Sequence, residues 1–177
     1  KVLGAAPRLE GLAPSSVSPP ERLHFTLEGI QGLEQLALRL GTSLDALLCT
    51  AFLDVVQSWN QDAPFSIVYV DWSATQGTLL YRLPSDSAGE EFATRARARH
   101  AALQRERATA QGPSKARASR HAATSDAFSC VYTAMLPGYA PALPPGVVRS
   151  GGGSNTPGVA LDCISMRDGS RLLVNWD

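Results

Sequence analysis

A helix that is apolar on most of its sides is the feature that most limits how this chain can fold. Ser43 is a good N-cap and Asp45 lies in the first turn, where the helix dipole favours a carboxylate, so we predict a helix that runs to about Trp59. Its first apolar stripe consists of Leu48, Phe52, Val55, Val56 and Trp59, and its second consists of Leu44, Leu47 and Ala51. A helix of this kind has to be buried between other elements, which predicts a layered domain.

Strand-like segments accompany this helix. The segment Phe65–Val70 is β-branched and aromatic and is bounded by Pro64 and Asp71, which is typical of a strand. Further strands are expected at Leu23–Leu27, at Leu79–Leu83, at Phe128–Leu136 and in a terminal hairpin around Arg167-Asp168-Gly169. The Asp-Gly pair supplies the positive φ angles that a tight turn needs.

Two further helices complete the pattern. Helical spacing over Gly32–Leu40, followed by Gly41 as a stop, predicts a short helix. Ser87 and Glu90 form a capping box that should open a helix to about Thr109. On this helix arginines are expected to cover the outer faces, and the inward positions are Phe92, Ala96 and Leu103. The order of elements predicts an α/β or α+β sandwich in which helices cover a mixed sheet.

The domain organisation is simple. Residues 1–22 are rich in Pro, Ser, Gly and Ala, which indicates an extended connector. Residues 23–177 are expected to form one domain, because a chain of 177 residues can bury roughly 70% of its unfolded surface. The chain does not begin with Met and has no signal segment, so we expect it to be a piece of a longer protein.

The charge balance and the cysteine positions exclude several classes of function. Lys plus Arg and Asp plus Glu each total 16, so the chain as a whole should not be drawn to nucleic acid or to an anionic membrane. No apolar run reaches the ~20 residues of a membrane span. Cys49, Cys130 and Cys163 lie in apolar runs, which predicts buried thiols in a reducing, cytoplasmic compartment. No metal site is expected, because the histidines share no ligand spacing with these cysteines.

Three stretches form a pattern with a fixed order. The first is the helix from Ser43-Leu44 to Val55-Val56-Gln57-Ser58-Trp59, and the second is the strand Ser129–Leu136 with its aromatic-Thr step. The third is Ser154–Asp162, followed after thirteen residues by Trp176-Asp177. Together they resemble heterocyclisation domains, the condensation-type domains of nonribosomal peptide synthetases.

The resemblance has departures. Asn155 and Gly158 replace two glutamines of the family pattern, and Gln76–Leu80 lacks an Asp-Phe pair that should follow the Phe65 strand. The pattern also covers only the C-terminal half of such a domain. The resemblance therefore implies one lobe of the chloramphenicol-acetyltransferase-like fold, with the N-terminal lobe of the same domain as a partner.

The same resemblance implies a chemistry. Acyl and Cys, Ser or Thr substrates, carried on the phosphopantetheine of carrier domains, would be condensed and cyclised to thiazoline or oxazoline, with no cofactor bound directly by the chain. Asp162 would shuttle protons, because hydroxide is a poor leaving group near neutral pH. Thr133 would orient that carboxyl or relay a proton, since its hydroxyl both donates and accepts.

Other interpretations stay open. Strand alternation places Asp162 on the face opposite Leu161 and Cys163, and that face could be partly solvated. Thr133 could be an ordinary β-branched strand residue, Trp176 an anchor for the hairpin and Asp177 a strand-end carboxylate. A catalytically degenerate half-domain with a docking or structural role in a synthetase is the alternative function.

Positive charge is concentrated between Arg95 and Arg120. This segment holds eight Lys and Arg residues against Glu106 alone. A solvated helix face is the simplest interpretation. Alternatively, an acidic carrier protein could dock there, since such a field speeds encounter, and the candidate docking residues are Arg95, Arg99 and Arg107. Nucleic-acid binding is the weakest interpretation, because no aromatic residues are interleaved with the basic ones.

Overall fold

The computed structural model describes seven stretches of the chain, which are residues 23–60, 65–71, 79–84, 89–110, 130–136, 161–168 and 171–176. The expected connector, residues 1–22, lies outside the described residues. The hairpin turn expected at Gly169 also lies outside them. For part of the strand residues, Asp162 among them, the backbone is described and the side chain is not.

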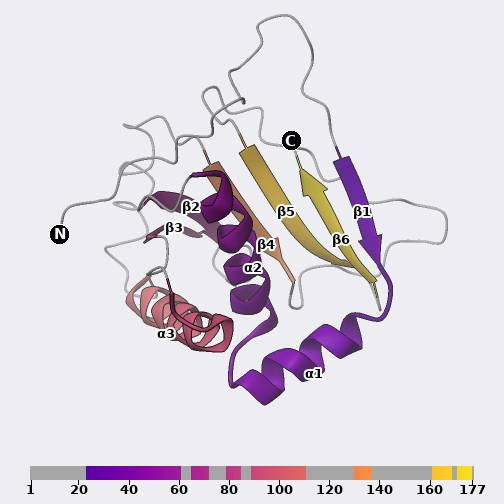
Figure 1. Ribbon diagram of the computed structural model, residues 1–177, viewed down its shortest axis with the longest axis horizontal. Helices are drawn as coiled ribbons and strands as arrows, with labels where there is room; N and C mark the ends of the chain where they lie inside the picture. The colour runs from indigo at the N-terminus through magenta and orange to yellow at the C-terminus, as the bar shows by residue number, and fades with distance from the viewer. Residues whose placement is uncertain are drawn as a thin grey trace, which may run out of the picture.

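A six-stranded mixed sheet forms the centre of the molecule (Figure 1), in the order β1-β6-β5-β4-β2-β3. Its strands are β1 Leu23–Leu27, β2 Ser66–Asp71, β3 Leu79–Pro84, β4 Cys130–Met135, β5 Leu161–Asp168 and β6 Arg171–Trp176. The three central strands β2, β4 and β5 are parallel, and the outer strands add antiparallel pairs. The prediction of a mixed sheet covered by helices is confirmed.

The described helices are α1 Ile30–Leu40, α2 Leu44–Trp59 and α3 Phe92–Ala110. In Figure 1, α2 lies across one face of the sheet, α3 packs beside α2, and α1 lies beyond the lower ends of β5, β6 and β1. Gly41 ends α1 as predicted, in the left-handed conformation with φ of 67°, and its N–H reaches back to the carbonyl of Leu38. Within the described residues no single helix is long and apolar enough to cross a membrane, and α1 and α2 pass that test only as a pair bent by 93°.

The start of α3 differs from the prediction. The carbonyl of Glu91 accepts the first helical hydrogen bonds, from the N–H groups of Thr94 and Arg95. Glu90 precedes the helix, and Gly89 has a positive φ of 91° that a helix cannot contain. The capping box expected from Ser87 and Glu90 is therefore wrong, and Ser87 itself lies outside the described residues.

Ser43 precedes α2 as predicted, but its side chain has a different role. Its extended backbone lets its carbonyl accept the N–H of Leu47 at 2.9 Å, while the hydroxyl makes no capping hydrogen bond. That hydroxyl is instead 2.8 Å from Nδ1 of His100 on α3. The residue therefore joins the start of α2 to the neighbouring helix.

The main core lies between the sheet and α2. Phe52 of α2 packs on Tyr132 of β4 with ring centroids 5.2 Å apart, and Tyr132 packs on Tyr69 of β2 at 5.7 Å. The three cysteines, Cys49, Cys130 and Cys163, are buried thiols of this core, as predicted. Residues that alternate with these strand positions are buried on the opposite face, where no described helix lies, and include Val68, Val131, Ile164 and Met166.

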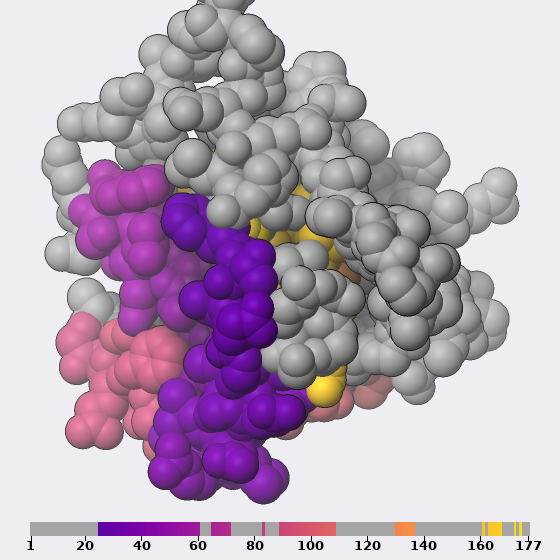
Figure 2. Space-filling model, turned by 90° about the vertical axis from the view of Figure 1, so that its right-hand side faces the viewer, coloured from indigo at the N-terminus to yellow at the C-terminus, as the bar shows by residue number. Residues whose placement is uncertain are grey.

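The β1 edge of the sheet is the more open part of the molecule. Phe25 and Leu27 are 52% and 48% exposed, and the indigo β1 segment lies at the surface in Figure 2. The parallel centre, in contrast, is buried on both faces, as strands of parallel sheets usually are. Any site that needs exclusion of water is therefore best sought along β2, β4 and β5.

Candidate functional site

The sheet brings the two residues expected from the sequence onto neighbouring parallel strands. Thr133 is on β4 and Asp162 is on β5, and the backbone register pairs Val131 with Asp162 and Thr133 with Ile164. Because residues two apart on a strand share a face, positions 133 and 162 lie on the same face of the sheet. Positions 29 residues apart in the sequence thus become diagonal neighbours in space.

On the β4 side, this pair of positions is shielded from solvent. The residue Thr133 is 7% exposed, and Ile164 beside it is also buried. The side chain of Asp162 lies outside the described residues, as does Asp177. The backbone of Trp176 lies between Cys163 of β5 and Leu23 of β1. Of the closing motif, residues 154–160 lie outside the described residues as well.

On the helix-covered face of the same strands, a buried hydrogen bond links β4 to β5. The hydroxyl of Tyr132 donates to Oγ of Ser165 at 3.0 Å. Burial, followed by the nearby Cys163 and Cys49, raises the pKa of Tyr132 well above its usual value. The phenol is therefore neutral near pH 7 and remains a donor. Sequence reasoning missed this pair, because Tyr132 and Ser165 both have the pattern of ordinary strand residues.

A cluster of charged side chains lies next to Tyr69 and joins three elements of the fold. Arg107 of α3 donates from Nε to Asp71 of β2 at 2.6 Å and from Nη2 to Asp45 of α2 at 2.5 Å. The hydroxyl of Tyr69 also donates to Asp45, at 3.0 Å. Asp71 is 0% exposed. One guanidinium thus holds two buried carboxylates, which fixes α3 against both α2 and the sheet.

The electrostatics of the cluster favour its ionised form. Burial alone would raise the pKa of Asp45, but Arg107, together with hydrogen bonds from Ser43 and Tyr69, lowers that pKa below its usual 3.8. Burial opposes the charge of Arg107 in the same way, and the two carboxylates outweigh it and raise the pKa of Arg107. The ion pair between Arg107 and Asp45 therefore persists across the physiological pH range.

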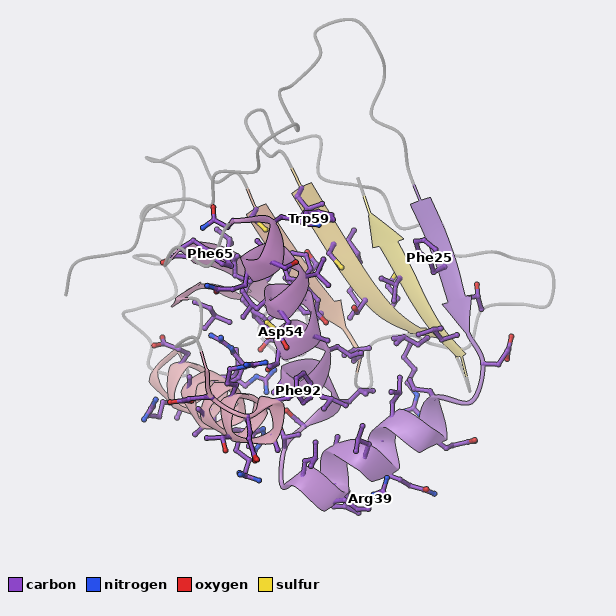
Figure 3. All side chains as sticks on the ribbon, viewed as in Figure 1. Phe25, Arg39, Asp54, Trp59, Phe65 and Phe92 are labelled. Carbon is purple, nitrogen blue, oxygen red and sulfur yellow. The ribbon has the colours of Figure 1, made fainter. Side chains whose placement is uncertain are left out.

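The structure contradicts the prediction that the arginines of α3 cover only its outer faces. Arg95 bonds to Asp54, labelled on α2 in Figure 3, at 2.5 Å. Arg99 is 3% exposed, and Arg107 belongs to the charged cluster. The expectation of solvated side chains is wrong for these three residues, and their intramolecular contacts oppose a docking role. The exposed arginines of the described part of α3 are Arg97 and Arg105.

A metal centre has no support from the described residues. Among them, no group of three or more His, Cys, Asp or Glu side chains could hold a metal ion. The three buried cysteines come from α2, β4 and β5 and lie among apolar side chains. Within the described part of the chain, the functional candidates are therefore Thr133, the position of Asp162, and the buried polar groups behind them.

Comparison with known proteins gives a clear result for structure and none for sequence. No protein-family model and no curated protein matches the chain. Among solved structures, the FmoA3 nonribosomal peptide synthetase matches 99% of this chain and 21% of its own, with a TM-score of 0.69 and 22% identity. The EpoB cyclization-docking bidomain from Sorangium cellulosum matches 98% of this chain and 40% of its own, with a TM-score of 0.63 and 19% identity.

A third match is a condensation domain. The first condensation domain of the CDA synthetase matches 89% of this chain and 38% of its own, with a TM-score of 0.63 and 15% identity. The chain thus spans between about a fifth and two fifths of these proteins. It has the fold of a C-terminal condensation-type half-domain, which confirms the fold expected from the sequence.

Proposed function

We propose that this chain is the C-terminal lobe of a heterocyclisation domain, which condenses carrier-bound substrates and closes them to thiazoline or oxazoline rings. The observation that carries the proposal is the register of β4 and β5, which places positions 133 and 162 on one face of adjacent strands. The sequence pattern around these two positions supports the cyclising class, and the likeness to the EpoB cyclization-docking bidomain supports it further.

The chemistry divides into two stages. In condensation, the amine of a carrier-bound Cys, Ser or Thr attacks an acyl thioester, which forms an amide and releases a carrier thiol. In ring closure, the thiol or hydroxyl of the substrate side chain adds to the new amide carbonyl, and its proton passes to the carbonyl oxygen. The resulting hydroxyl takes up a second proton and leaves as water, while nitrogen loses a proton. Asp162 would give the proton to the leaving hydroxyl and take the one from nitrogen, which is general acid–base catalysis.

Thr133 would support this carboxyl. A threonine hydroxyl can accept one hydrogen bond and donate another, so it can orient a carboxyl or pass a proton to it. The small exposure of Thr133 helps, because water competes little for such contacts at a site that must expel water. In this proposal both residues contact the substrate or the proton that moves.

The partners follow from the same proposal. Substrates reach the lobe on the phosphopantetheine arms of peptidyl or aryl carrier domains, and the N-terminal lobe of the same domain completes the cleft. Carrier docking on α3 stays a prediction, and the exposed arginines of the described part of that helix are Arg97 and Arg105. The location of the synthetase in the cytoplasm also stays a prediction.

The test replaces Asp162 with Asn in the synthetase that carries this chain. Mass spectrometry of carrier-bound products separates the condensed linear amide from the ring, because ring closure removes one water. We expect ring closure to fall by on the order of 100-fold or more, and the linear amide to accumulate. The matched control is Asp168→Asn, at the hairpin end of the same strand, which should close rings at the wild-type rate.

The departures from the family pattern favour a second candidate, a catalytically degenerate half-domain with a docking or structural role. Asn155 and Gly158 stand where the pattern has glutamines. The same experiment separates the two candidates. If Asp162→Asn leaves ring closure unchanged, Asp162 has no catalytic duty and the degenerate half-domain is the better account.

A further inference from the structure

A side-chain hydrogen bond joins β4 to β5 directly behind the proposed site. Tyr132, which donates it, immediately precedes Thr133 in β4. Ser165, which accepts it, immediately follows Ile164, the register partner of Thr133. Both residues are buried, so water does not compete for the bond. The bond therefore connects the two strands of the site at the level of Thr133.

The tyrosine that makes this bond is itself held in place. Its ring contacts Phe52 of α2 and Tyr69 of β2, with ring centroids at 5.2 and 5.7 Å. These contacts are between rings, so the hydroxyl of Tyr69, which bonds to Asp45, takes no part in them. A shift of Tyr132 would therefore require movement of α2 and β2 as well.

Stability alone does not account for a polar pair at this place. The main-chain hydrogen bonds between β4 and β5 already hold the strands together. Replacing both partners of a buried hydrogen bond with apolar groups of similar shape is often nearly neutral for stability, because the desolvation cost disappears with the bond. What such a bond adds is a defined distance and direction between the two strands.

We propose that Tyr132 and Ser165 are positioning residues, which fix β4 against β5 and thereby set Thr133 relative to Asp162 on the opposite face. The inference rests on the proposed function, in which these two residues act together. A misplacement of about 1 Å can cost on the order of 100-fold in rate, so a small slip between the strands is enough to slow ring closure. Neither residue contacts the substrate in this proposal.

The test uses Tyr132→Phe, Ser165→Ala and the double variant in the synthetase that carries this chain. Single-turnover rates are measured separately for condensation and for ring closure. We expect each single variant to slow ring closure about tenfold and to leave condensation unchanged. The double variant should match the single ones, because both changes remove the same bond. Ser165→Thr, which keeps a hydroxyl, should restore ring closure.

The matched control is Tyr69→Phe. It removes the hydroxyl of the other buried tyrosine, whose bond runs to Asp45 of α2 and not between β4 and β5. This variant should close rings close to the wild-type rate. Equal rates for Tyr132→Phe and Tyr69→Phe, or equal slowing of condensation and ring closure by Tyr132→Phe, would overturn the positioning role.

A parallel measurement on Asp162→Asn separates this inference from the proposed function. If Asp162→Asn closes rings normally, the proposed function fails and the positioning role fails with it. If Asp162→Asn is inactive in ring closure while Tyr132→Phe and Ser165→Ala react at the wild-type rate, only the positioning role fails.

Discussion

Helices α2 and α3 pack on each other and on the same side of the sheet, but they are held by different chemistry. α2 buries apolar side chains such as Phe52, Leu53 and Val56. α3 buries Ala96 and Leu103 as well, but it is also fixed by Arg95 and Arg107, which reach carboxylates on α2 and β2. A charged helix is therefore not automatically a solvent-facing one, because carboxylates supplied by its neighbours can draw its cations inward.

The largest expected effect comes from breaking the charged cluster. Arg107→Met should lower the free energy of unfolding by about 4 kcal/mol, because it removes the cation that the buried carboxylates of Asp45 and Asp71 both contact. Urea denaturation of the wild type and the variant measures the loss. The contrasting variant is Arg95→Met, which should cost less than about 1 kcal/mol, since its partner Asp54 has a side chain 41% exposed.

A triple variant distinguishes the loss of ion pairs from the loss of side-chain packing in the same cluster. Arg107→Met combined with Asp45→Asn and Asp71→Asn should recover most of the lost stability, because neither of the two side chains then carries a charge that the lost cation has to balance. If the triple variant is as unstable as Arg107→Met alone, the arginine stabilises the molecule through the packing of its stem and not through its ion pairs.

The next largest expected loss of stability comes from the apolar side chains that α2 buries. Leu53→Ala should lower the free energy of unfolding by about 3 kcal/mol, through lost burial and the cavity left between α2 and the sheet. The same denaturation experiment applies. Leu38→Ala on α1 is the control, because its 80% exposed side chain buries little apolar surface. Similar losses for both leucines would contradict the assignment of the core.

The smallest expected effect is a dependence on pH. The pKa of Asp45 is lowered in the folded protein, so its ionised form contributes stability above the pKa of the unfolded chain, near 4. That contribution is lost as the pH falls through the lower, folded pKa. The stability difference between the wild type and Asp45→Asn should therefore be constant near pH 7 and shrink below about pH 4. A difference that grows on acidification would contradict the sign of the shift.

Regular elements could be predicted from the sequence because local patterns determine them. The period-3.6 apolar stripes of α2 and the β-branched run of β2 are such patterns, and both elements are found within a residue or two of their expected bounds. The start of α3 was missed because a local capping signal, Ser87 with Glu90, did not prevail over the left-handed Gly89.

The inward arginines of α3 did have a signal in the sequence. Arg99 and Arg107 fall on the same helical stripe as Ala96 and Leu103, so the stripe as a whole faces inward. What the sequence could not supply is the partner, because Asp71 comes from a strand 36 residues away. The pairing of Tyr132 with Ser165 was hidden for the same reason, since strand register depends on the folded sheet.

The proposed pairing of Thr133 with Asp162 is tested most directly by a double-mutant cycle on the two residues, with ring closure by the proposed parent synthetase as the readout. Thr133→Val removes the hydroxyl with little change in shape, and Asp162→Asn removes the proton-shuttling group. If the two residues act as one unit, the double variant should close rings no more slowly than Asp162→Asn alone. Rate losses that multiply, as for independent residues, would contradict the claim that β4 and β5 together build the site.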